Sequence, residues 1–393
     1  MKPNKPTSLY IVIFLGLLTA ITPLATDLYL PALPIMPDEL NTTTSLIQMT
    51  IGIMTFGIAF GQLLGGPLSD AMGRKKPLII GNLLCVVASL ICAYAPNIET
   101  LLIARFFQGF TGSMGVVIAK AIARDYASGQ ELMRLMSLLM LVNGLAPVIA
   151  PLIGGQLLLF STWRFIFILL TMFSILLLIG SILFTESLPP EKRLTGNIST
   201  TFSNYKALLT DKAFAGQTLV QLFAFGAFFA YITGSSFVYQ NIFHLSAQEF
   251  SYMFGINSCG LILASFIISK ISNIVKPKQI LHFSLWQLLI GSSLFLLAML
   301  YNWSFATTSV ILFLTVCTVS LFGSSGFSMA MAKYGHLAGS ASAVLGFASM
   351  FSAGIVSPLI GIGGEYTGVP MGIVMVICTG LALITYYTLI TEK

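Results

Sequence analysis

Asp27 is the residue of this sequence best placed to exchange a proton with its surroundings. It lies in the segment TPLATDLYLPALP, residues 22–34, and it is the one acidic residue well inside any long apolar run of the chain. A carboxylate buried among apolar side chains is costly as an ion, so it has to be protonated, paired with a cation or placed in a wet cavity. We therefore predict that Asp27 binds a proton, with a structural ion pair as the alternative.

Arg105 is a second ionisable residue inside an apolar run, at the start of the segment RFFQGFTGSMG. Asp27 stands about five residues before the end of the first run and Arg105 about six residues after the start of the fourth, so both lie roughly 7–9 Å deep at about 1.5 Å per residue. We expect the two residues to interact, directly or through water, as a proton-coupling pair. The alternative is an arginine bonded to backbone carbonyls.

The composition decides what kind of element positions these two residues. The chain has 393 residues, of which 56% are hydrophobic and only 8% are charged, whereas soluble chains carry about a quarter charged residues. Apolar runs of about 20 residues recur along its whole length, and each can cross the ~30 Å hydrocarbon core of a bilayer as a helix. Because the alternating strands of a membrane barrel are absent, we predict an all-α integral membrane protein.

Twelve membrane spans are expected, divided equally by a polar connection in the middle of the chain. This division predicts an N-terminal six-helix bundle over residues 1–184, a linker over 185–211 and a C-terminal six-helix bundle over 212–393. A repeat of PLIGG (from Pro151) as PLIGIGG (from Pro358) supports the two halves. The expected spans are 8–32, 45–69, 77–95, 99–124, 134–159, 162–184, 212–241, 247–270, 278–300, 305–328, 338–363 and 367–391.

The distribution of basic residues predicts the orientation in the membrane. Nearly all lysines and arginines fall on the side that holds both termini, and by the positive-inside rule that side is cytoplasmic. The net charge of +6 is then explained by topology, so no nucleic-acid partner is expected. The five cysteines all fall within expected spans without a CxxC pair, so we expect neither disulfides nor a metal site. A bacterial inner membrane is the expected location.

The connection between the second and third spans, GPLSDAMGRKK from Gly66, has the chemistry of a charged turn. Gly73 permits a tight turn, and Asp70 can pair with the basic cluster at the anionic inner surface. The segment resembles the signature loop of the major facilitator superfamily, and the resemblance implies a loop that latches the two halves when the cytoplasmic side is closed. A purely topogenic loop is the alternative. The expected gating residues are Gly66, Asp70, Gly73, Arg74 and Lys75.

The fifth span carries a motif rich in glycine and proline, NGLAPVIAPLIGG, residues 143–155. Prolines bend a helix and glycines let a neighbouring helix approach closely, which suits a sliding interface. The motif loosely resembles the antiporter signature of the superfamily, with Ala146 where a glycine would strengthen the match. The expected helix-packing residues are Gly144, Pro147, Pro151, Gly154 and Gly155.

Three further segments narrow the resemblance to one branch of the superfamily. TDLYLPALP (from Thr26), RDY (from Arg124) and WRFIF (from Trp163) resemble the bicyclomycin/chloramphenicol-resistance branch of the twelve-span drug/proton antiporters. The resemblance covers essentially the whole first half and, more weakly, GSASAVLG in the eleventh span. It implies the major facilitator fold, with twelve transmembrane helices in two six-helix halves, and proton-coupled export.

A substrate pocket is expected where polar and aromatic residues gather near the two charged residues. The seventh span is strongly aromatic, and part of it could line an apolar cavity for lipophilic compounds. Aromatic side chains that face lipid are the alternative. The expected substrate-binding residues are Tyr29, Leu30, Gln108, Asn143, Gln221, Phe225 and Phe228.

These features together predict a proton-coupled efflux transporter of small lipophilic or cationic compounds that works by alternating access. A major facilitator transporter dedicated to one metabolite, such as a sugar, an amino acid or a siderophore, is the alternative. An enzyme is not expected, because the sequence has no HExxH, GxSxG or phosphate-binding GxxxxGK[ST] motif. The expected partners are the substrate, protons and the lipid bilayer, with no cofactor, and the chain is expected to act as a monomer.

Overall fold

A computed structural model describes residues 9–193, 198–271, 274–334 and 337–390. Within these ranges the secondary structure is helical, with no strand. Twelve helices are long and apolar enough to cross a membrane, and each overlaps one of the twelve expected spans. The predicted fold class, an all-α membrane protein with twelve spans, is therefore confirmed.

The helices follow one another with short connections. Six long ones come first: α1 Leu9–Asp27, α3 Thr44–Met72, α4 Lys75–Ala93, α5 Ile98–Tyr126, α6 Gly129–Leu157 and α7 Trp163–Leu183. Six more follow: α9 Lys212–Phe237, α10 Ala247–Ile271, α11 Pro277–Leu300, α12 Phe305–Tyr334, α13 Ala338–Ile360 and α14 Val369–Thr385. Two helices are short, α2 Met36–Glu39 and α8 Ile198–Thr210.

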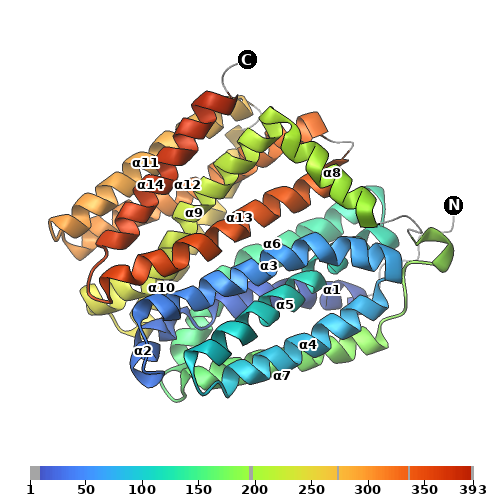
Figure 1. The fold of residues 1–393 in the computed structure, drawn as a ribbon, viewed down its shortest axis with the longest axis horizontal. Helices are drawn as coiled ribbons and strands as arrows, with labels where there is room; N and C mark the ends of the chain where they lie inside the picture. Colours follow the sequence, from blue (N-terminus) through green and yellow to red (C-terminus); the bar gives the residue numbers. More distant parts are fainter. Residues whose placement is uncertain (1–8, 194–197, 272–273, 335–336, 391–393) are drawn as a thin grey trace.

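The long helices gather in two groups (Figure 1). In the first group α3 packs on α5, α4 packs on α7, and α1 packs on α5 and α6. In the second group α9 packs on α13 and α14, while α11 packs on α12 and α14. Between the groups the broadest contacts are those of α3 with α13 and of α6 with α10. That the two groups are separate domains with boundaries at 184 and 212 stays a prediction.

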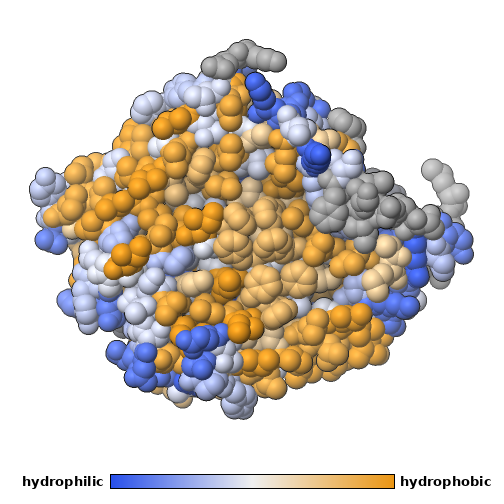
Figure 2. All heavy atoms as spheres, viewed as in Figure 1, coloured by the Kyte–Doolittle hydropathy of each residue, from blue (hydrophilic) through white to orange (hydrophobic). Residues whose placement is uncertain are grey.

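Two ends of the molecule can be distinguished along the helix axes. We call the end that holds α2 the α2 side, and the end that holds α8 the α8 side; they lie at lower left and upper right in Figure 1. Because short connections join consecutive long helices, each runs in the opposite direction to the one before it in the chain. A broad apolar band lies between polar ends on the visible face (Figure 2), as expected for helices in contact with lipid.

The first span is interrupted earlier than the sequence predicts. The α-helix α1 ends at Asp27 rather than continuing to residue 32, and a 3-10 helix follows over Leu30–Ile35. Pro31 and Pro34 have no backbone N–H to donate to the preceding turn, so the α-helical hydrogen-bond pattern cannot continue through them. Asp27 therefore stands at the end of the α-helix instead of about five residues before it.

Glycines bring α3 and α5 into direct backbone contact. A methyl group at Gly57 would overlap the carbonyl oxygen of Phe106, and one at Gly109 would overlap the carbonyl oxygen of Met54. Small residues of this kind are the usual means by which helices pack closely in membranes. The close packing fixes the helix that carries Arg105.

Candidate functional site

A cavity of about 290 Å³ lies between the two groups of helices. It is mostly apolar and takes side chains from both groups, and Asp27 and Lys120 are the two charged residues that line it among those the structure describes. Its lining residues are Thr22, Pro23, Thr26, Asp27, Thr55, Ile58, Gln62, Val116, Lys120, Asn143, Pro147, Phe228, Phe229, Tyr231, Ile232, Phe254, Ser258, Leu261, Val316 and Met350.

Asp27 is the acidic member of the cavity. It is 5% exposed, and among the described residues its carboxylate makes no hydrogen bond or ion pair that would satisfy it. The α-helix ends at Asp27, and its side chain lines the cavity between the two groups. A carboxylate without a fixed partner is free to accept a proton or to attract a positively charged group.

Arg105 is not the partner of Asp27 among the described residues. It is fully buried, and its Nη1 donates to the Ala25 carbonyl oxygen at 2.9 Å and to Gln108 Oε1 at 2.6 Å. Its guanidinium carbon lies 4.4 Å from the centre of the Tyr29 ring, a cation–π distance. The expected direct interaction of Asp27 with Arg105 is therefore absent. The arginine instead binds the backbone of α1 two residues before Asp27.

The partners of Arg105 include residues that were expected to bind substrate. Gln108 donates from Nε2 to Ser89 Oγ at 2.8 Å while its Oε1 accepts from the arginine. The Tyr29 hydroxyl is hydrogen-bonded to Thr50 Oγ1 at 2.9 Å. Tyr29, Leu30 and Gln108 are all buried and lie outside the cavity lining. The turn after Asp27 directs Tyr29 toward the arginine instead.

The other expected pocket residues divide between cavity and core. Asn143 and Phe228 line the cavity. Gln221 instead donates to Ser349 Oγ at 3.1 Å, and Phe225 packs edge-on against Phe322 with ring centres 5.2 Å apart. These two lie elsewhere on α9 because a helix directs successive residues to different neighbours.

Sequence reasoning missed several lining residues. Lys120 was not among the expected pocket residues, yet it lines the cavity from α5. Tyr231 and Phe254 also line it, and the Tyr231 hydroxyl accepts a hydrogen bond from Asn257 Nδ2 at 2.8 Å. Their signal in the sequence was weak, because aromatic residues are common throughout the spans.

Several hydrogen bonds join the two groups at the α2 side, and we call four of them the α2-side contacts. In each of them a neutral side chain of one group donates to a main-chain carbonyl oxygen of the other. They are Ser236 Oγ to Leu30 O at 2.7 Å, Gln240 Nε2 to Pro31 O at 3.0 Å, Ser45 Oγ to Pro358 O at 2.6 Å and Gln248 Nε2 to Gly155 O at 2.6 Å. The cavity is therefore closed off at this end.

The glycine- and proline-rich motif of α6 contributes to this closed end. A methyl group at Gly154 would overlap the Leu28 carbonyl oxygen, and one at Gly155 would overlap Ser251 Oγ of α10. The carbonyl oxygen of Pro147 accepts a hydrogen bond from Ser258 Oγ at 3.3 Å, while Pro151 is buried in the same helix. Gly144 does not serve as expected, because it is exposed and a methyl group added there would meet nothing within 4 Å.

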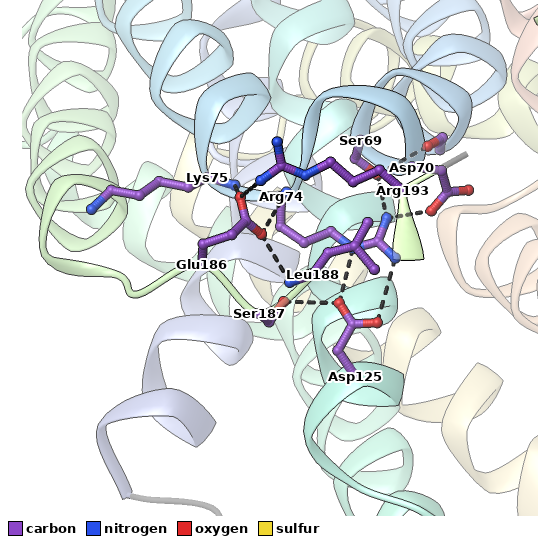
Figure 3. A network of polar contacts seen from close by, with 10 residues as sticks. Ser69, Asp70, Arg74, Lys75, Asp125, Glu186, Ser187, Leu188 and Arg193 are labelled. Atoms are coloured by element: carbon purple, nitrogen blue, oxygen red, sulfur yellow. Dashed lines mark hydrogen bonds and ion pairs between the residues drawn. The ribbon is translucent and has the colours of Figure 1, made fainter. Parts of the chain in front are cut away.

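At the α8 side the expected gating loop forms a polar network (Figure 3). Arg74 donates to Asp70, to Ser69 Oγ at 2.8 Å and, through Nε, to Asp125 Oδ2 at 2.9 Å. Gly73 has the positive φ of 88° that a glycine adopts readily. These partners all belong to the first group, and among the described residues no hydrogen bond or ion pair joins the loop to α9–α14.

Glu186, in the segment after α7, binds the backbone of the gating loop at Arg74 and Lys75. Its carboxylate accepts the backbone N–H groups of Arg74 at 2.9 Å, Lys75 at 3.1 Å and Leu188 at 3.0 Å. Partial burial alone would raise the pKa of Glu186, but these hydrogen bonds together with Arg193 hold it below its ordinary value. Gly66, the remaining residue of the loop motif, packs near Val117 of α5.

The sequence is similar to those of known transporters over its whole length. The family model described as Major Facilitator Superfamily matches residues 15–358. The chain is 40% identical over 395 residues to an uncharacterized MFS-type transporter, YdgK, of Bacillus subtilis, covering 100% of this chain and 98% of that protein. It is 29% identical over 397 residues to a bicyclomycin resistance protein homolog of Haemophilus influenzae, covering 100% and 99%.

The fold is similar to that of solved transporters. A crystal structure of the nucleoside transporter NupG superposes with a TM-score of 0.79 at 12% identity, covering 98% of this chain and 100% of that one. At this identity the likeness concerns the fold alone.

Proposed function

Because this chain belongs to the Major Facilitator Superfamily, and is therefore a multi-pass membrane transporter rather than an enzyme, we propose that it is a proton-coupled exporter of small lipophilic or cationic compounds. The observation that carries the proposal is Asp27, an acidic side chain without a fixed partner in a mostly apolar cavity between the two groups. The name of the Haemophilus relative, a bicyclomycin resistance protein homolog, supports export of drug-like compounds.

Proton and substrate compete at Asp27 in the proposed mechanism. The ionised carboxylate attracts a cationic or polar substrate, and a proton that binds a carboxylate oxygen neutralises it and releases the substrate. When the cavity faces the other side of the membrane, the proton leaves and substrate binds again. Each cycle then exchanges protons entering the cell for substrate leaving it.

Arg105 acts as a positioning residue in this mechanism. Its two hydrogen bonds tie the last turn of α1, through the Ala25 carbonyl, to Gln108 on α5. The end of the helix, and with it the Asp27 side chain, is held at the edge of the cavity. The alternative ion-pair role would require the contact that the described residues lack.

Alternating access is supported by the uneven closure of the cavity. The α2-side contacts close one end, whereas Lys120, which lines the cavity toward the α8 side, is exposed. We propose that the α8 side faces the cytoplasm of a bacterial inner membrane, with both termini there, so that this conformation faces inward. In the opposite state the gating loop around Arg74 would meet α13 and form the latch that the resemblance to the signature loop implies. A monomer suffices, because the cavity is built from one chain.

A transporter dedicated to a single metabolite is the second candidate. The cavity carries hydroxyl and amide groups that could form specific hydrogen bonds with one polar substrate. They belong to Thr26, Thr55, Gln62 and Asn143. A panel of chemically unrelated compounds distinguishes the two proposals.

The test measures export by purified protein in liposomes with an imposed pH gradient. Wild type should move several unrelated lipophilic cations, such as ethidium and tetraphenylphosphonium, uphill. Asp27→Asn should abolish proton-driven export. The matched control Asp38→Asn changes an exposed acid just beyond the same segment and should have no effect. Full proton-driven export by Asp27→Asn would disprove the proposed coupling, and transport of a single metabolite alone would favour the second candidate.

A further inference from the structure

Lys120 is a charged residue of the cavity that has no role in the proposed mechanism. It lies on α5, lines the same cavity as Asp27 and is exposed. Lysine near the end of a span commonly extends to the membrane surface and binds anionic lipid headgroups. Lys120 instead faces the space between the two groups of helices, so a lipid-facing role does not account for its position.

No acidic side chain neutralises Lys120 in the described part of the chain. The nearest carboxylate along the helix, Asp125, is bound by Arg74 at 2.9 Å and by the Ser187 hydroxyl at 2.8 Å. Arg124, one turn further along α5, adds a second positive charge at this end. The α8-side end of the cavity is therefore positively charged, whereas its other end holds Asp27.

The two charged residues are too far apart to pair with each other. Positions 22 on α1 and 112 on α5 are level, because a methyl group at Gly112 would lie 3.7 Å from Thr22 Oγ1. Asp27 is five residues from that level toward the α2 side and Lys120 is eight residues toward the α8 side, which separates their backbones by about 20 Å at about 1.5 Å per residue. Even with a lysine side chain leaning toward the start of its helix, the charges stay beyond ion-pair distance.

An unsatisfied hydroxyl lies between the two charges. Thr22 Oγ1 is buried, lines the cavity and has no hydrogen-bond partner among the described residues. A buried polar atom of this kind is usually satisfied by water or a ligand. The cavity thus offers a cation, a free hydroxyl and, at its far end, a carboxylate, along otherwise apolar walls.

The geometry points to Lys120 as an anion-binding residue, and to substrates that include lipophilic compounds bearing a carboxylate, sulfonate or similar group. The anionic group binds the Lys120 ammonium at the α8-side end, and the apolar body extends between the aromatic side chains of α9 and α10. This inference rests on the proposed function for the transport step, but binding at Lys120 requires no proton coupling. It extends the proposed substrates beyond lipophilic cations.

The test compares the binding of two dyes that share one cationic body. Rhodamine 110 carries a free carboxylate, and rhodamine 123 is its methyl ester, so they differ only in the anionic group. Fluorescence anisotropy with purified protein in lipid nanodiscs, without any gradient, should show that wild type binds rhodamine 110 about tenfold more tightly than rhodamine 123, as one charge-assisted contact provides. Equal binding, tighter binding of the ester or no binding of either dye would overturn the inference.

Two variants locate the preference at this residue. Lys120→Met should remove it by weakening rhodamine 110 alone, and Lys120→Arg, which keeps the charge, should retain it. Lys270→Met removes an exposed lysine at the same side but outside the cavity, and should behave like wild type. An unchanged preference in Lys120→Met would show that the carboxylate binds elsewhere. Asp27→Asn should keep the dye preference, so failure of proton coupling and failure of this inference give different results.

Discussion

Replacing Gly155 by alanine should open the α2 side of the cavity. Gly155 lies where α6 meets α10, its carbonyl oxygen accepts a hydrogen bond from Gln248 Nε2 at 2.6 Å, and a methyl group there would overlap Ser251 Oγ. The two helices would have to separate to admit the methyl group. Gly144→Ala on the same helix is the matched control, because a methyl group at that position meets nothing within 4 Å.

The expected size of the effect follows from these contacts. Loss of one neutral hydrogen bond costs about 1 kcal/mol, and forcing an extra methyl group into a close-packed contact costs about 1–3 kcal/mol. The closed state should therefore lose about 2–4 kcal/mol relative to a state in which the helices are apart. At about 1.4 kcal/mol per factor of ten, the ratio of closed to open molecules should fall by about 30- to 700-fold.

Distances between spin labels at Glu99 and Tyr301 measure this ratio. Both positions are exposed and stand at the α2 side, one in each group. With Cys259 and Cys317 replaced by serine to avoid labelling them, pulsed electron–electron resonance should show a longer distance in Gly155→Ala than in wild type. Gly144→Ala should match wild type. If both alanine variants give the wild-type distribution, the contact of α6 with α10 does not hold the α2 side closed and the reasoning is refuted.

Three other predictions concern the interior and the α8 side. Gly57→Ala should lower the free energy of unfolding by about 1–3 kcal/mol, measured by thermal denaturation in detergent, because α3 and α5 must separate; unchanged stability would contradict the close packing. A double-mutant cycle of Asp27→Asn and Arg105→Met on the free energy of unfolding should give a coupling energy below about 0.5 kcal/mol, since the two side chains share no direct contact; a larger value would support an ion pair. Because the pKa of Glu186 is lower folded than unfolded, its stabilising effect should be present above about pH 4.3 and be lost as pH falls through the native value. The melting temperatures of wild type and Glu186→Gln should then converge on acidification, and a constant difference would argue against this role.

The sequence predicted the number of spans because each apolar run must match the thickness of a bilayer, which is a constraint on length alone. It placed the end of α1 too late, since hydropathy continues through Leu28, Tyr29 and Leu30 while Pro31 already prevents a regular α-helix. Hydropathy is a property of a whole segment, whereas a proline acts on a single turn. An apolar run can therefore continue past the residue at which the α-helix ends.

The direction in which a side chain points from its helix was less predictable than its depth in the membrane. Asp27 and Arg105 were assigned to the same depth from the ends of their runs, but hydropathy does not encode how α1 and α5 are rotated, and the arginine meets a backbone carbonyl instead of the carboxylate. For the same reason the sequence did not indicate that Lys120 lines the cavity. Gly144 and Gly155 belong to one motif, yet only the second meets another helix.

The chemistry of the α2-side contacts has a consequence for the proposed proton coupling. All four are bonds between neutral groups, so neither salt nor pH alters their strength directly. Their acceptors are main-chain carbonyls, which every residue possesses, so a substitution at an acceptor position never removes the acceptor itself, whereas a substitution at one of the four donors can remove the donor. In the proposed mechanism a proton therefore finds no titratable group at these four contacts. In the proposed mechanism the proton would act on these contacts only by changing what occupies the cavity, so proton binding to an empty transporter would not by itself open the α2 side.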